Sequence, residues 1–154
     1  MKTAAWKYAH QSQLLLDGTF GICNSRMLLF IALGVDGFGK GIPLAFFLFS
    51  APTGSRATHT GYDSTILQQL LKAWKQLLGS QGGMAFTPFI AITDTDTKER
   101  AALSMVWPDI WLLLCKFHLR QCWSNRRKKL LRFSATFNFP KKQVLAQLKC
   151  LEEE

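Results

Sequence analysis

The sequence has no apolar run long enough to cross a bilayer as a helix. Its longest runs, 27–35 and 42–49, are too short and are separated by a glycine-rich turn. The N-terminus lacks the apolar core of a secretory signal, so we expect neither export nor a membrane partner. The four cysteines show no Cys-x-x-Cys spacing, which favours reduced thiols over a disulfide framework.

Two common catalytic motifs are also missing. The glycines at 34, 37, 39 and 41 do not precede a helix, so they form no phosphate-binding P-loop. No Gly-x-Ser-x-Gly segment is present to expose a nucleophilic serine. We therefore expect no small-molecule substrate of these two enzyme classes, while the oligomeric state stays open.

Acidic residues are absent between Ile110 and Leu151, in a chain whose formal net charge is +9. Aromatic side chains such as Trp123 lie among the basic ones, a combination typical of nucleic-acid binding. The alternative is a solvated basic helix face without a ligand. The residues that we expect to contact nucleic acid are Lys116, Arg120, Arg126, Arg127, Lys128 and Lys129. The cluster at 126–129 is also compatible with entry into the nucleus.

Two aspartates each follow an apolar run that reads as a buried strand. Asp17 comes after Leu14–Leu16, and Asp94 comes after 89–93. In open α/β sheets, ligands lie beyond the carboxyl ends of strands, so two such carboxylates can hold a divalent cation between them. The alternatives are a turn aspartate at 17 and a helix cap at 94, although Asp96 or Thr97 is better placed to cap.

The hydrophobic pattern predicts a single α/β domain with elements in the order βββαβαβα. The first three strands should pair antiparallel, because short turns join them. The helix before the fourth strand allows that strand to join the sheet in parallel, and the wholly apolar fifth strand should be central or parallel. A loop is expected at 51–60 and a flexible loop at 80–85. The predicted strands are 13–22, 27–35, 42–50, 86–93 and 110–115, and the helices are 63–78, 98–106 (capped by Thr97), 117–131 and a short one ending at Leu151.

Cys115 and His118 form an isolated Cys-x-x-His pair where the fifth strand meets the basic helix. Structural zinc needs four ligands, and no second pair has suitable spacing. A buried cysteine followed by a histidine that contacts a phosphate or carboxylate is the competing interpretation.

Four blocks of sequence together resemble the Mutator-like element (MULE) transposase domain. They are Asp-Gly-Thr-Phe at 17–20, Gly-Val-Asp-Gly-Phe-Gly-Lys-Gly-Ile-Pro-Leu-Ala-Phe at 34–46, Ile-Thr-Asp-Thr-Asp-Thr-Lys-Glu-Arg-Ala-Ala-Leu at 92–103, and the segments 106–110 and 114–119 around Cys115 and His118. Their order and spacing agree with the family over about residues 14–123.

The resemblance implies an RNase H-like mixed sheet and a DDE-type site that uses Mg²⁺ or Mn²⁺ to cleave or join DNA strands. Asp17 and Asp94 match the first two acidic residues, as catalytic groups and metal ligands. Cys115 and His118 match the family signature. The core is expected at 12–132, with a tail at 133–154 that begins an insertion.

No residue of this chain is assigned as the third acid of the resemblance, so we expect a partial domain that is inactive alone and binds metal weakly. One alternative is a non-catalytic nucleic-acid-binding remnant or a domesticated transposase fragment. Another is a zinc-stabilised interaction module built on Cys115 and His118.

Overall fold

An antiparallel three-stranded meander forms the first part of the sheet. In the computed structural model, which describes residues 1–20, 27–50 and 62–133, the strands are β1 (Gln13–Phe20), β2 (Met27–Val35) and β3 (Gly41–Ser50). The β2–β3 turn is held by Asp36, whose carboxylate accepts hydrogen bonds from the backbone N–H groups of Phe38 and Lys40 at 2.9 and 2.8 Å. The predicted antiparallel pairing is confirmed.

Two short strands extend this meander in parallel. β6 (Ile90–Thr93) pairs with β1, and β7 (Trp111–Leu114) pairs with β6, so the sheet order is β3-β2-β1-β6-β7. This mixed order is compatible with an RNase H-like fold. The fifth strand was predicted to be central or parallel, and β7 is indeed parallel. It is not central, because it lies at the edge of the sheet, and most of its side chains are exposed.

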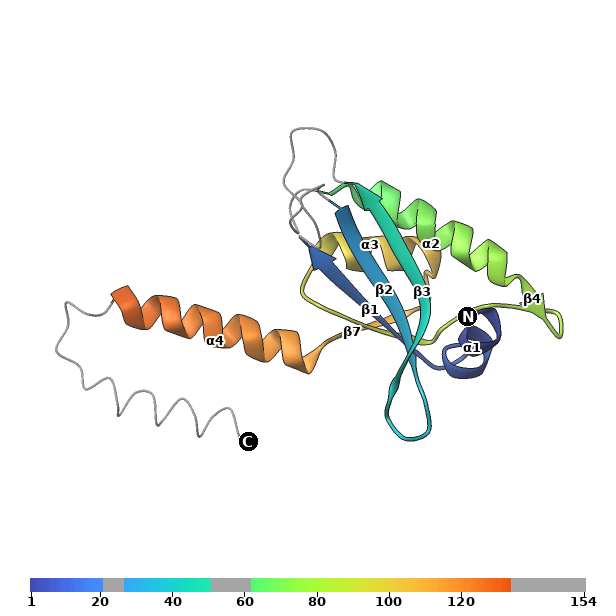
Figure 1. Ribbon diagram of the computed structural model, residues 1–154, viewed down its shortest axis with the longest axis horizontal. Helices are drawn as coiled ribbons and strands as arrows, with labels where there is room; N and C mark the ends of the chain where they lie inside the picture. Colours follow the sequence, from blue (N-terminus) through green and yellow to red (C-terminus); the bar gives the residue numbers. More distant parts are fainter. Residues whose placement is uncertain (21–26, 51–61, 134–154) are drawn as a thin grey trace. The chain divides into compact units, whose positions relative to one another are not determined.

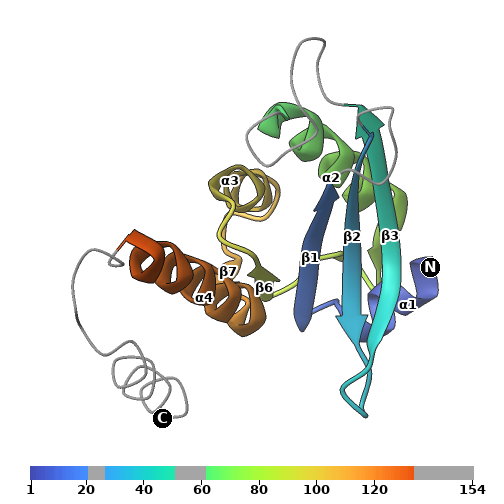
Figure 2. The same cartoon turned by 60° about the vertical axis from the view of Figure 1, so that its left-hand side comes forward.

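Two helices cover one face of the sheet. α2 (Ser64–Leu78) and α3 (Thr97–Val106) lie side by side against it (Figures 1 and 2). α2 presents a buried stripe at three- and four-residue spacing, namely Leu67, Leu71, Trp74 and Leu78, as its apolar pattern predicted. From the sheet, alternate residues such as Leu14, Leu16 and Phe30 meet this stripe in the core.

Local chemistry explains where the structure differs from the predicted elements. The expected flexible loop at 80–85 is a small hairpin of β4 (Ser80–Gln81) and β5 (Met84–Ala85), because Gly82 and Gly83 both adopt positive φ. The fourth strand is shorter than expected and begins at Ile90, after Pro88, which lacks a backbone donor. The helix α1 (Lys2–Tyr8) was not predicted.

The chain divides into two units, Met1–Cys115 and Lys116–Glu154. Within the second unit, α4 (Lys116–Phe133) is the predicted basic helix, slightly longer than expected. The predicted loop at 51–60 and the short helix ending at Leu151 lie outside the described residues, and the division into a 12–132 core and a 133–154 tail stays a prediction. No helix in the described part of the chain has the length and apolar character needed to cross a membrane.

Gly34 in β2 lies directly under α1. A Cβ atom on Gly34 would lie 2.8 Å from the Cβ of Tyr8 and 3.3 Å from its carbonyl group, too close for either to stay in place. We expect Gly34→Ala to push α1 off the strand and to lower the free energy of unfolding by about 1–3 kcal/mol. The measurement is urea unfolding, with Gly37→Ala as the control, because nothing lies within 4 Å of a Cβ there. Equal stability of the two variants would contradict this close approach.

Candidate functional site

Asp17 lies in β1, and Asp94 directly follows β6, the parallel strand that pairs with β1. The β1–β6 register pairs Gln13 with Ile90 and Leu15 with Ile92, and its continuation by two residues sets Asp17 beside Asp94. Adjacent strands lie about 4.8 Å apart. Asp17 is the fifth of the eight residues of β1 and so lies near the middle of the strand, in agreement with the sequence prediction that it lies near the middle or the end. Its side chain alternates with those of Leu14 and Leu16, which face the core.

Cys115 joins the same row. β6 pairs with β7 through Thr93 and Leu114, and the next pair in this register is Asp94 with Cys115. The Cys115 N–H donates a hydrogen bond to the carbonyl oxygen of Thr93 at 2.7 Å, which extends the pairing past the end of β7. Continued in this way, the two registers align three of the residues predicted from sequence, with Asp17 inside β1 and with Asp94 and Cys115 directly after β6 and β7. His118 belongs to α4 in the second unit.

A tight turn after β6 fixes Asp94 and starts α3. The Asp94 carboxylate accepts a hydrogen bond from the Asp96 N–H at 2.6 Å. Asp96, not Thr97, is the helix cap, since its carboxylate accepts from the Lys98 N–H at 2.9 Å. Its other oxygen accepts from the Tyr62 hydroxyl at 2.8 Å. With the capping assigned to Asp96, the alternative reading of Asp94 as a helix cap does not apply.

Glu99 is a buried acid in the first turn of α3 that was not among the site residues predicted from sequence. Its side chain is 1% exposed, and within residues 1–20, 27–50 and 62–133 no donor reaches its Oε1 atom. The pKa of Glu99 is raised to about 9, mainly by burial and in addition by the negative charges of Asp94, Asp96 and Asp17. The carboxyl group is therefore neutral at pH 7.

The helical spacing of α3 contains the signal that could have identified Glu99. The buried residues of α3 are Glu99, Ala102, Leu103 and Val106, which share one face at three- and four-residue spacing. An acid on the apolar stripe of a helix is either paired or functional, because burying a charged group without a partner is costly.

Arg100 ties the start of α3 to the edge strand. Its guanidinium group donates to the hydroxyl oxygen of Thr93 at 3.1 Å and to the carbonyl oxygens of Leu112 and Leu113 at 3.3 and 3.4 Å. Its positive charge lowers the pKa of Glu99, an effect smaller than the effects that raise it. The turn that contains Asp94 and Asp96 is thus anchored to β7 through Arg100.

The carboxylates suit a hard divalent cation, such as Mg²⁺ or Mn²⁺, in their chemistry. Oxygen donors from aspartate and glutamate are what these ions prefer, and the buried, unpaired Oε1 of Glu99 is a donor atom that lacks a partner. In the described conformation, however, no three Asp, Glu, His or Cys side chains of the described residues are gathered closely enough to form a ready ligand sphere. The same finding gives no support to a preformed zinc site at Cys115 within these residues.

The basic residues of α4 divide between faces of the helix. Positions four, three and four residues apart lie on one face, and there the helix carries Lys116, Arg120, Trp123 and Arg127, which we name the basic stripe. Trp123 is 52% exposed on this stripe. The remaining predicted residues, Arg126, Lys128 and Lys129, are distributed around the other sides of the helix. A basic stripe with an exposed indole is suited to phosphates and to base stacking.

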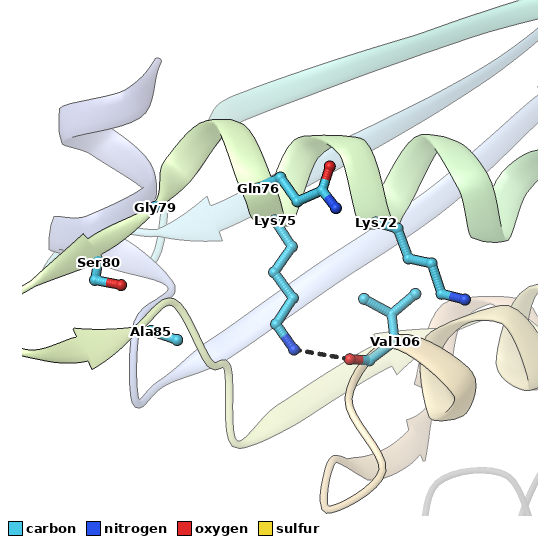
Figure 3. A pocket seen from close by; sticks show the side chains of 7 residues that line it. All are labelled: Lys72, Lys75, Gln76, Gly79, Ser80, Ala85 and Val106. Atoms are coloured by element: carbon cyan, nitrogen blue, oxygen red, sulfur yellow. Dashed lines mark hydrogen bonds between the residues drawn. The ribbon is translucent and has the colours of Figure 1, made fainter.

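A hollow lies at the C-terminal end of α3. It measures about 430 Å³, and Lys72, Lys75 and Val106 are among the residues that line it (Figure 3). Lys75 donates a hydrogen bond to the carbonyl oxygen of Val106 at 2.9 Å, and its ammonium group lies 5.5 Å from the Trp107 ring centroid. This lysine therefore closes the C-terminal end of α3, where a positive charge is favourable.

The model of the MULE transposase domain family matches residues 13–122. The chain belongs to this family. The match begins with β1, includes both aspartates of the row, and ends inside α4. Transposase-related function follows from this membership, and no curated protein matches the chain. The matched residues 13–122 contain both Asp17 and Asp94.

Proposed function

We propose that this domain is part of the catalytic core of a DDE-type transposase, which acts on DNA phosphodiesters with a divalent cation. The observation that supports the proposal is the parallel β1–β6 register, whose continuation by two residues would pair Asp17 with Asp94. Membership of the MULE family supports it independently. Asp17 and Asp94 are the residues that would hold Mg²⁺ or Mn²⁺.

A bound cation of this kind would activate the attacking oxygen and stabilise the leaving oxygen in an in-line displacement. The protein contributes position and charge. β1 lies between β2 and β6 in the sheet, and Asp17 itself is held by its pairing with Ile31 of β2. Asp94 is oriented by the N–H of Asp96, and Asp96 in turn is held by Tyr62 and by the start of α3.

We propose DNA as the partner of the basic stripe on α4. Lys116 and Arg120 are exposed, and each can neutralise a phosphate, while Trp123 offers a flat surface for a base. No base-reading side chain is distinguished in this set, so we expect binding without sequence preference. Binding through α4 alone, without cleavage, is the second candidate function, favoured by the absence of a ready three-ligand sphere in the described part of the chain.

Mn²⁺ should raise the melting temperature of the wild-type domain by a few degrees, because two carboxylates give weak binding and ligand binding stabilises the folded state. Asp17→Asn and Asp94→Asn should each abolish this rise. The measurement is a thermal-denaturation series in increasing Mn²⁺.

Asp109→Asn is the matched control, since Asp109 is exposed, follows α3 and removes one charge in the same way. It should keep the full Mn²⁺ effect. Survival of the rise in both Asp17→Asn and Asp94→Asn would move the cation elsewhere and leave DNA binding without catalysis as the better proposal.

A further inference from the structure

Phe38 is exposed at the tip of the turn between β2 and β3. Its side chain is 91% exposed, and a Cβ atom on either neighbouring glycine, Gly37 or Gly39, would have nothing within 4 Å. The turn projects past the other strands at this end of the sheet (Figures 1 and 2). A ring this exposed buries almost no apolar surface, so the fold gains little from a phenylalanine at this position.

Hydrogen bonds within the turn hold the ring in a fixed place. The Asp36 carboxylate accepts from the backbone N–H groups of Phe38 and Lys40 at 2.9 and 2.8 Å. The Asp36 N–H donates to the carbonyl oxygen of Lys40 at 2.9 Å, and the Gly39 N–H donates to the carbonyl oxygen of Asp36 at 3.0 Å. Because the turn is already restrained, little conformational entropy is lost when the ring meets a ligand.

The charges around the ring favour nucleic acid as that ligand. Lys40 is exposed on the same turn, and Lys7 is exposed on α1, the helix that lies against Gly34 near the base of the turn. Asp36 is the one acid of the turn, and its carboxylate is directed to the backbone of the turn itself. An exposed aromatic ring with cations near it suits a base and its phosphates.

We propose that the β2–β3 turn is a second contact for DNA, in which Phe38 stacks on an unpaired base and Lys40 binds a neighbouring phosphate. The proposal rests on the proposed function, because it takes DNA as the ligand of this domain. Asp17 pairs with Ile31, which precedes Asp36 by five residues along β2, or about 17 Å at the rise of a strand. About five base pairs of DNA have this length, so one DNA molecule is long enough to reach both the turn and Asp17.

Binding of labelled DNA with a single-stranded overhang tests the stacking, and a blunt duplex serves as the second ligand. Phe38→Ser should weaken binding of the overhang DNA by about five- to a hundredfold, the range for loss of one stacked base, and weaken binding of the blunt duplex less. Phe38→Trp should restore the affinity, because it restores an aromatic ring. Lys40→Gln should instead reduce the slope of log affinity against log salt by roughly one.

Met105→Ser is the matched control, because Met105 is also an exposed apolar side chain, on α3, and its loss should leave binding of both DNAs unchanged. Thermal denaturation should show equal stability for Phe38→Ser and the wild type. Equal affinity of these two proteins for overhang DNA would overturn the proposal, as would a loss that Phe38→Trp does not restore. Either result leaves the proposed function intact, whereas absence of DNA binding by the wild type rejects the proposed function itself.

Discussion

Glu99→Gln is expected to remove most of the loss of folding stability that the wild-type domain suffers as the pH rises from about 5 to about 9. The pKa of Glu99 is raised from 4.5 to about 9 in the folded state, first by burial and then by Asp94 and Asp96. Between these values the unfolded chain has released the proton and the folded chain retains it. Because the unfolded state binds fewer protons, stability falls with pH across this window and stays low above it.

The effect is large relative to the stability of a domain. A shift of one pKa unit corresponds to roughly 1.4 kcal/mol, so the loss reaches several kcal/mol, with about 6 kcal/mol as an upper limit. Urea unfolding of the wild type, Glu99→Gln and Asp109→Asn at several pH values measures it. The control should follow the wild type, while Glu99→Gln should diverge upward with pH. Parallel profiles for Glu99→Gln and the wild type would show that Glu99 titrates normally.

Replacing the three charges of the basic stripe with glutamine is expected to weaken DNA binding by about two to three orders of magnitude at about 0.1 M salt. Each phosphate contact contributes about 0.9 to the slope of log affinity against log salt, so three lost contacts reduce the slope by roughly three. The variant carries Lys116→Gln, Arg120→Gln and Arg127→Gln. The measurement is a titration of labelled duplex DNA from low to moderate salt.

The matched control removes the same charge from the other sides of the helix, through Arg126→Gln, Lys128→Gln and Lys129→Gln. It should lose less affinity and keep more of the salt slope, because those residues do not share the face of Lys116 and Trp123. Circular dichroism checks that α4 remains helical in both variants. Equal losses would mean that the helix acts as a diffuse charge, and salt-insensitive binding would reduce the stripe to a solvated face.

Patterns that depend on local periodicity could be read from the sequence. The three antiparallel strands, the buried stripe of α2 and the helix capped near Asp63 follow from apolar spacing, turn residues and capping chemistry. The pairing of β6 with β1 followed from the helix that precedes β6. The prediction of Asp17 and Asp94 as site residues depended on identifying the two strands, β1 and β6, from their apolar runs.

Features set by tertiary contacts were harder to predict. Glu99 looks like an ordinary first-turn acid until the packing of α3 shows that its face is buried. β7 has the apolar character of an interior strand, yet its position at the sheet edge depends on the order of strands and not on its composition. α1 is seven residues long, too short for periodicity to identify, and it is held by packing against β2 and β3.

The parallel pairing of β1 with β6 also orders events during folding. The β1–β3 meander closes over short turns, whereas the pairing that brings Asp94 to Asp17 joins residues 77 positions apart, as the Gln13–Ile90 register shows. Contacts between residues so distant in sequence form slowly, because the intervening chain must first lose its freedom. We therefore expect repulsion among the acidic groups to arise late in assembly, together with the burial of side chains from β6 and α3, such as Ala91 and Leu103, that opposes it.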